Sequence, residues 1–188
     1  MGRWEPNARG RLEEAALELY RERGFEQTTV AEIAQRAGLT ERTFFRYFTD
    51  KREVLFGGQS TLNELFVRSV AEAPPSASPL DAVAAALEAT AGLLESRRAL
   101  ARQRQAVIAA NADLQERELL KLASLASALA GALRQRGVAE PAASLAAEAG
   151  IAVFRVAFER WIDDDRGRPL AELMRASLDE LKALTAGT

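Results

Sequence analysis

Hydrogen-bonding and cationic side chains are concentrated between residues 29 and 51 of this 188-residue chain. An arginine can donate two hydrogen bonds to one guanine, and a threonine can contact a base edge or a phosphate. A lysine can pair with a phosphate. The residues with this chemistry, together with two aromatic side chains between them, are Thr29, Thr40, Arg42, Thr43, Phe45, Arg46, Tyr47 and Lys51. We predict that they bind double-stranded DNA.

The sequence around these residues predicts a first short helix and a tight turn. Thr29 followed three residues later by Glu32 forms a capping box, so a helix begins near Val30. Its apolar side chains recur at three- and four-residue spacing, which gives the helix one buried face. Gly38 supplies the left-handed backbone that ends such a helix.

A second and a third helix are predicted directly after the turn. Thr40 is a good N-cap for the second helix, whose buried face is formed by Phe44 and Phe48, one helical turn apart. Asp50 and Glu53 repeat the capping pattern with a carboxylate, so a third helix is expected to begin at Lys51.

Two helices joined by a short turn with glycine are typical of the helix-turn-helix motif, in which the second helix enters the major groove of DNA. The alternative is a three-helix bundle whose charged residues are only solvated. An earlier helix over 8–23 carries an apolar stripe that includes Leu12 and Tyr20. We expect Leu17 and Phe25 to pack into a small core with Ile33 and Phe44.

The same region resembles the head of the TetR family of transcriptional regulators over roughly residues 8–56. The matching patterns are Thr-Val-x-x-Ile-Ala (29–34), Ala-Gly-Leu-Thr (37–40), Thr-Phe-Phe-x-Tyr-Phe (43–48) and Asp-Lys-x-x-x-Leu (50–55). One residue departs from the family pattern, because Phe45 stands where a tyrosine is usual. A phosphate hydrogen bond from that phenol is lost, whereas apolar contact with a thymine methyl group is retained.

Charge favours a few oriented contacts over general attraction to nucleic acid. Residues 1–55 hold ten basic and ten acidic side chains, 10 − 10 = 0, and the whole chain has a net charge of −2. A protein that coats the DNA backbone without selectivity is expected to be strongly basic. Pairing of two subunits doubles the local basic patch without requiring a positive chain.

Composition excludes several classes of chemistry. The chain has no cysteine and no histidine, so disulfides, thiolate sites and imidazole metal sites are excluded. We expect no metal, no cofactor and no enzymatic activity, because the remaining acid, base and nucleophilic side chains form no recognisable group. The sequence shows no apolar segment of spanning length, and we expect a cytoplasmic protein without membrane attachment.

The rest of the chain reads as helix throughout, so we predict an all-α fold. A helix-turn-helix DNA-binding domain over residues 1–50 is followed by a larger helical regulatory and dimerisation domain over 51–188. A single helix over 51–71 is expected to link the two, and a proline-rich loop over 71–79 ends it. Later helices are predicted at 80–95, 97–110, 113–136, 141–163 and 169–184.

The last two helices carry apolar residues that suggest an interface between two subunits. The helix over 141–163 has two apolar stripes, one of Leu145, Ala149, Ala152 and Val156, and one with more small residues. A helix with two buried faces needs two neighbours, although a fully buried helix inside a monomer is the alternative. The resemblance implies a homodimer that pairs through its final two helices. The interface residues predicted here are Gly150, Val153, Ala157, Trp161, Leu173, Met174, Leu178 and Leu181.

The middle helices surround a small-molecule pocket, as the resemblance implies. Isolated polar residues among apolar ones are candidates for orienting a mostly apolar ligand. The candidates are Glu88, Thr90, Gln105, Asn111, Arg155 and Glu159, with Phe154, Phe158 and Trp161 as wall or core. We therefore expect a homodimeric repressor that an apolar ligand releases from a palindrome-like operator. The alternatives are an activator of the same fold and a helical protein-interaction scaffold.

Overall fold

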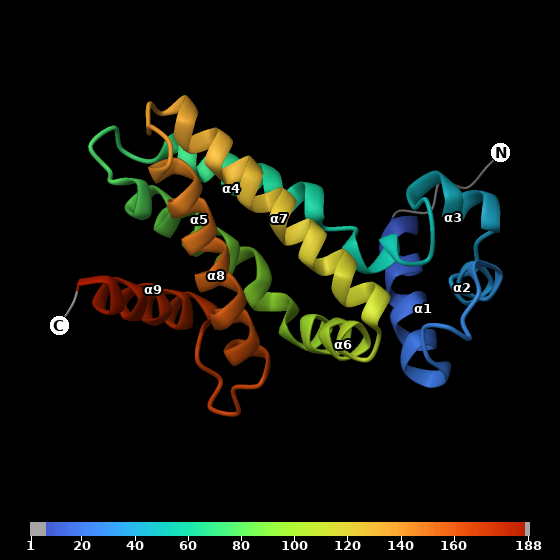
Figure 1. The fold of residues 1–188 in the computed structure, drawn as a ribbon. Coiled ribbons are helices and arrows are strands. Elements are labelled where there is room, and N and C mark those ends of the chain that lie inside the picture. Colours follow the sequence, from blue (N-terminus) through green and yellow to red (C-terminus); the bar gives the residue numbers. More distant parts are fainter. Residues whose placement is uncertain (1–6, 187–188) are drawn as a thin grey trace. The chain divides into compact units, whose positions relative to one another are not determined.

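A computed structural model describes residues 7–186, and within them the chain is helical, with nine α-helices, two short 3-10 turns and connecting loops (Figure 1). The predicted all-α fold class is confirmed. The chain forms two compact units. The first comprises the chain up to Gly58 together with Gln103–Glu118, and the second comprises Gln59–Arg102 together with the chain from Leu119 onward.

The first unit is built on three N-terminal helices, which are α1 (Ala8–Arg23), α2 (Val30–Arg36) and α3 (Glu41–Tyr47). Their buried faces form one core that includes the four side chains predicted to pack there, Leu17, Phe25, Ile33 and Phe44. Gly38 has φ +66°, so the left-handed turn predicted between α2 and α3 is present. Arg11 donates to the Ala37 carbonyl and so holds the end of α2 onto α1.

The helix predicted over residues 51–71 is two pieces instead of one. A 3-10 turn, η1, covers Glu53–Phe56, and helix α4 begins only at Gln59 and continues to Glu72. Gly57 and Gly58 separate them, because two successive glycines lose more backbone entropy in a helix than other residues do. The predicted Asp50 cap is present, since its Oδ1 accepts from the amides of Arg52 and Glu53 at 2.8 and 3.1 Å.

A later segment of the chain completes the first unit. Helices α6 (Arg98–Ala109) and α7 (Ala112–Gln135) meet in a turn near Asn111. Side chains from the end of α6 and the start of α7 join the core of α1 to α3, namely Val107, Ile108 and Leu114. Two arginines fix the segment to η1: Arg104 Nε donates to the Leu55 carbonyl at 2.6 Å, and Arg117 pairs with Glu53. The sequence gives no local signal for these contacts, because the partners are far apart along the chain.

The second unit packs the remaining helices around an apolar core. Besides α4 and the rest of α7, these helices are α5 (Pro79–Leu94), α8 (Ala142–Ile162) and α9 (Leu170–Ala186), with a 3-10 turn η2 (Glu95–Arg97) after α5. Each helix from α5 to α9 lies within two residues of its predicted bounds. Ser78 caps α5 by accepting from the Asp81 amide at 3.2 Å, as the restart signal before Pro79 predicts.

Helix α9 runs antiparallel along α5, and three polar contacts tie it to α5 and to the η2 turn that follows. Glu95 Oε2 accepts from the amide of Leu170 at 2.9 Å and so caps the start of α9. One surface pair follows at 3.1 Å between Glu88 and Arg175, and another at 3.5 Å between Asp81 and Lys182. Exposed pairs contribute little each, so the contacts mainly fix the register of the two helices.

Within the part of the chain that the structure describes, no helix is long and apolar enough to cross a membrane.

Candidate nucleic-acid interface

Helix α3 presents one face to the first unit's core and the other to solvent. Phe44 is fully buried, and Phe48, directly after the helix, lies 5.5 Å from it between ring centroids. This anchoring leaves Arg42, Phe45 and Tyr47 exposed on the other side. The arrangement is the one predicted for a helix that reads the major groove.

Arg46 and Tyr47 hold each other in place on the exposed face. The Arg46 guanidinium carbon lies 4.9 Å from the Tyr47 ring centroid, and Arg46 Nη2 lies 3.1 Å from the phenol oxygen. Adjacent residues on a helix point in different directions, so these two side chains bend along the helix surface to reach each other. The phenol is thereby fixed beside a positive charge, where both groups can meet a phosphate.

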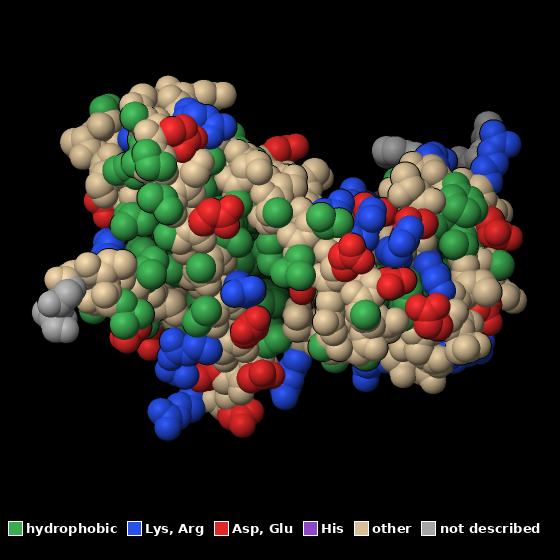
Figure 2. Space-filling model, viewed as in Figure 1, with side chains coloured by type: hydrophobic (Ala, Val, Ile, Leu, Met, Phe, Trp, Pro, Cys, Tyr) green, Lys and Arg blue, Asp and Glu red, His purple; other side chains and the backbone are tan. Residues whose placement is uncertain are grey.

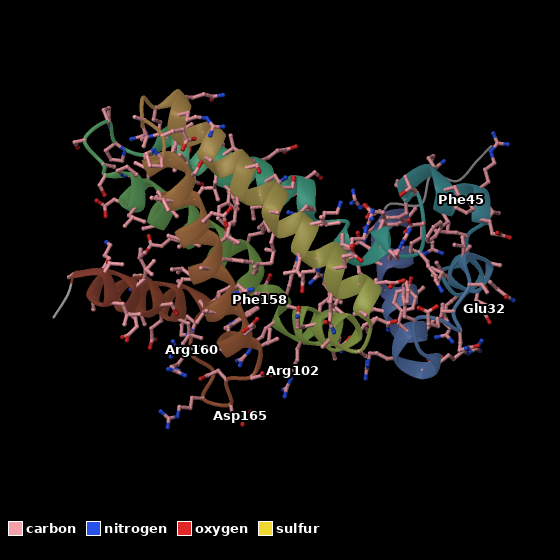
Figure 3. All side chains as sticks on the ribbon, viewed as in Figure 1. Glu32, Phe45, Arg102, Phe158, Arg160 and Asp165 are labelled. Carbon is pink, nitrogen blue, oxygen red and sulfur yellow. The ribbon has the colours of Figure 1, made fainter. Side chains whose placement is uncertain are left out.

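Phe45 is the most exposed aromatic side chain of α3, with 55% of its surface accessible (Figure 3). Its ring meets Phe44 edge-on at 5.4 Å, which limits how far it can turn. Its chemistry suits a thymine methyl group or a deoxyribose.

Three predicted threonines have structural hydrogen bonds of their own. Thr29 and Glu32 form the predicted capping box, in which Glu32 Oε2 accepts from both the amide and the hydroxyl of Thr29 at 2.9 Å. Thr40 caps α3 by accepting from the Thr43 amide at 3.2 Å. The hydroxyls of Thr40 and Thr43 also lie 3.1 Å apart. Each threonine hydroxyl already takes part in a hydrogen bond at the start of α2 or α3. Any contact with DNA would therefore involve a hydroxyl that is already hydrogen-bonded.

Lys51 is placed differently from the sequence expectation. Its ammonium group donates to the carbonyls of Phe25, Glu26 and Thr28 at 2.9, 3.2 and 3.0 Å. The same nitrogen lies 4.4 Å from the Phe25 ring centroid. An ammonium group has three hydrogens. Lys51 therefore closes the loop between α1 and α2, and a phosphate could bind only by displacing one of these carbonyls.

The carboxylates around the turn are held in their charged form. The backbone and hydroxyl hydrogen bonds from Thr29 lower the pKa of Glu32, and Arg23 adds to this effect. Partial burial works to raise the pKa of Asp50, but hydrogen bonds from Arg52 and Glu53 lower it overall. These negative charges stand at helix starts, where they stabilise the caps.

The predicted ligand residues fall in both units. Gln105 and Asn111 belong to the first unit, where Gln105 Nε2 lies 3.4 Å from Glu118 Oε2. The second unit holds Glu88, Phe154, Arg155 and Phe158. Phe154 and Phe158 stack at 5.7 Å, and Phe158 is partly buried (Figure 3). Glu88 and Arg155 are exposed, so neither lies inside this unit.

The predicted dimer stripe is core within a single chain. Seven of its eight residues are buried in the second unit, namely Gly150, Val153, Ala157, Trp161, Leu173, Met174 and Leu178, whereas Leu181 is partly buried against the same core. Burial within the chain leaves these side chains little surface to offer a partner subunit. Gly150, for example, faces Val83 of α5. The stripe with small residues permits close packing inside the chain instead.

The other stripe of α8 is the one left exposed. Leu145 and Val156 have 66% and 45% of their surfaces accessible, and Ala152 between them is also exposed. Figure 2 shows hydrophobic side chains gathered on the face where α8 lies. Both stripes are apolar in the sequence, so periodicity alone could not tell which one faces α5.

Comparison with known proteins identifies the two parts of the chain separately. Residues 12–56 match the family model described as "Bacterial regulatory proteins, tetR family", and residues 77–186 match the model described as "MftR C-terminal domain". The chain is similar to the HTH-type transcriptional regulator TcmR of Streptomyces glaucescens, with 38% identity over 78 residues. That match covers 42% of this chain and 34% of TcmR, about a third of the relative's length.

Two solved structures resemble the chain over nearly its whole length. One is FadR from Bacillus subtilis in complex with stearoyl-CoA, with TM-score 0.62 and 22% identity, covering 92% of this chain and 96% of that one. The other is FadR from Thermus thermophilus, a transcriptional repressor in complex with lauroyl-CoA. Its TM-score is 0.53 at 26% identity, and 92% of each chain is covered. At 22% identity, the likeness to FadR from Bacillus subtilis shows a shared fold.

Proposed function

The chain belongs to the TetR family of bacterial transcriptional regulators, and we propose that it is a homodimeric repressor that leaves its DNA operator when an apolar small molecule binds. The family consists of regulators and not of enzymes. The observation that carries the proposal is the solvent-facing side of α3. It presents arginine and aromatic side chains on a helix fixed by a cap and by two buried rings.

The proposed reading surface is led by Arg42, Phe45, Arg46 and Tyr47. Arg42 is the candidate for a bidentate contact with guanine, and Phe45 for contact with a thymine methyl group. The Arg46 and Tyr47 pair is suited to a phosphate. Thr29 and Lys51 support this surface by fixing the start of α2 and the loop before it, and Thr40 and Thr43 support it by fixing the start of α3.

Pairing of two chains is proposed to use the exposed stripe of α8. Leu145, Ala152 and Val156 form an apolar row at helical spacing on the surface of the second unit. A row of this kind is stabilised when an identical row on a second copy covers it, as in a two-fold symmetric contact. Two heads would then bind a palindrome-like operator.

The proposed ligand is mostly apolar and binds in the second unit. Its helices enclose phenylalanine, leucine and alanine side chains in one core. The similar FadR of Thermus thermophilus was solved with lauroyl-CoA, a ligand with an acyl chain. A ligand that favours the form unable to bind DNA must weaken operator binding by the same coupling free energy. A regulator of this kind acts on chromosomal DNA, so we place it in the cytoplasm.

One experiment tests the DNA-binding proposal. Sequences that the protein retains from a random DNA pool are identified, and the best is titrated at fixed salt with the protein and with Arg42→Ala. We expect a palindromic sequence, bound roughly 5- to 150-fold more weakly by the variant. Retention of no preferred sequence would overturn the proposal. With the selected sequence placed in a reporter promoter, rising expression on addition of the protein would overturn its repressor part.

A further inference from the structure

Two polar atoms are buried in the second unit with nothing to bind. Thr90 Oγ1 of α5 and Trp161 Nε1 of α8 have no hydrogen-bond partner among the residues that the structure describes, and both side chains are 0% exposed. Buried polar groups in proteins are nearly always paired, so two such atoms in one core are a feature to be explained. An indole nitrogen can only donate, and a hydroxyl can donate or accept.

The two atoms lie along the same helix pair. Val83 packs against Gly150, and the Arg98 guanidinium, just beyond α5, lies 5.8 Å from the Trp161 ring centroid. Residue numbers thus rise together on α5 and α8, so these helices run parallel. Thr90 follows Val83 by 90 − 83 = 7 residues, which returns it to the same face two turns later. An equal step along α8 leads from Gly150 to Ala157, so helix geometry places Thr90 at the level of Ala157, one turn before Trp161.

An aromatic wall adjoins these atoms. Phe158 lies 5.7 Å from Trp161 and 5.7 Å from Phe154, and Phe154 meets Phe66 of α4 at 6.1 Å between ring centroids. Phe158 is partly exposed, so this row reaches from the core to the surface. An apolar molecule that displaced Phe158 outward would lie against rings on one side and meet the indole N–H at the inner end.

We propose that the ligand combines an apolar body with one carbonyl-type oxygen, and that this oxygen accepts hydrogen bonds from Trp161 Nε1 and the Thr90 hydroxyl. The Arg98 guanidinium lies 5.8 Å from the Trp161 ring centroid, and its positive charge favours an electron-rich atom nearby. The inference rests on the proposed ligand response and specifies the chemistry of its ligand. A neutral ketone or ester and a carboxylate share this chemistry.

The test uses three small probes of nearly equal size: acetophenone, benzoate and ethylbenzene, which lacks the oxygen. Trp4→Phe removes the only other tryptophan of the sequence, so the indole N–H resonance in a nitrogen-15 NMR spectrum belongs to Trp161. We expect acetophenone or benzoate to bind about tenfold more tightly than ethylbenzene and to move this resonance downfield. Tighter binding of acetophenone identifies a neutral acceptor, and tighter binding of benzoate identifies an anionic one.

Variants assign the effect to the two residues. Thr90→Val and Trp161→Phe are each expected to reduce the preference for the oxygen-bearing probe, whereas Thr61→Val, an exposed threonine on α4, leaves it unchanged. Thr90→Val keeps the shape of the side chain, so the test stands even where Trp161→Phe fails to fold. Equal binding of acetophenone, benzoate and ethylbenzene, binding of none of them, or an unmoved indole resonance would each overturn the inference.

These measurements contain no DNA. A protein that shows the preference but retains no operator sequence contradicts the proposed function and leaves this inference standing. A protein that binds an operator and shows no preference contradicts the inference alone.

Discussion

Gly150 of α8 lies against Val83 of α5 so closely that a Cβ at Gly150 would stand 2.4 Å from Val83 Cγ1. Two carbon atoms cannot approach to that distance without strain. The helices can pack at this spacing only because position 150 has no side chain. The contact fixes how α8 lies on α5, and with it the place of Trp161 about three turns later.

Gly150→Ala is therefore expected to lower the free energy of unfolding. Overpacking of a filled core costs about 1 to 3 kcal/mol, while alanine in place of glycine in a helix returns up to about 1 kcal/mol. We expect a net loss of about 1 to 2 kcal/mol in urea titrations. The double variant Val83→Ala/Gly150→Ala should lose less than the sum of the two single changes, and additive losses would contradict the close contact.

Lys51→Met is expected to destabilise the first unit. The change keeps the apolar stem but removes the ammonium group that binds three carbonyls, so the free energy of unfolding should fall by about 1 to 3 kcal/mol. Lys182→Met is the matched control, because Lys182 forms only a half-exposed pair with Asp81 and should cost less than about 1 kcal/mol. Equal, small losses would show that the carbonyl contacts contribute nothing.

Arg42→Ala and Tyr47→Phe are expected to affect DNA binding in different ways. Loss of the arginine should relax the preference at one base pair of the selected operator, at a cost of about 1 to 3 kcal/mol. Loss of the phenol oxygen should weaken binding to all sequences by a smaller factor, since the phenol is proposed to contact a phosphate. Arg175→Ala, on α9, is the control and should leave both the base preference and the overall affinity for DNA unchanged. Unaltered base preference with Arg42→Ala would remove that residue from the reading surface.

Leu145→Glu should separate the subunits without unfolding them. The charge would stand in the proposed interface, whereas in a single chain this side chain is exposed. Light scattering is expected to show the monomer mass with an unchanged helical circular dichroism spectrum. Val153→Glu should instead unfold the second unit, because it places a carboxylate in the buried core. A dimer that tolerates Leu145→Glu would move the interface away from this stripe.

Asp164 should contribute an acid-dependent share of stability. Hydrogen bonds from the Arg168 side chain and then its backbone amide lower the pKa of Asp164 from 3.8 to about 2. The carboxylate is thus more favourable in the folded chain than in the unfolded one. Its contribution is present above the unfolded pKa near 4 and is lost as the pH falls towards 2.

Unfolding free energies measured through this range test the assignment. Asp164→Asn should lower stability at neutral pH and flatten its fall between about pH 4 and pH 2. Asp163→Asn, at the exposed neighbouring position, is the control. Parallel curves of unfolding free energy against pH for the unchanged protein and for Asp164→Asn would contradict this role of Asp164.

Local signals in the sequence account for most of the fold. Thr29, Gly38, Thr40 and Ser78 each act on their own few neighbours, so capping chemistry predicted the helix boundaries around them. The predicted start of the helix over 51–71 is wrong, because the prediction gave more weight to the cap at Asp50 than to the two glycines that follow. Apolar periodicity in that stretch cannot distinguish one helix from a turn and a helix.

The functional surfaces were harder to predict, because they depend on contacts distant in sequence. The cap-forming threonines and the exposed face of α3 follow from their own helix, but the carbonyls that occupy Lys51 lie in another loop. The two stripes of α8 are equally apolar, and the helices that bury one of them, such as α5 with Val83, lie far away in the sequence. The pairing of Arg117 with Glu53 leaves no local pattern at all.

The turn between α6 and α7 has a consequence for how the DNA-binding head is made. Val107, Ile108 and Leu114 belong to the same core as Leu12 and Phe44. A ribosome that has released the chain only to Gly58 has therefore not yet supplied all of the head. The core of the head is supplied in full only once Leu114 has been made, so a gene fragment that ends before Leu114 encodes α3 without its full core.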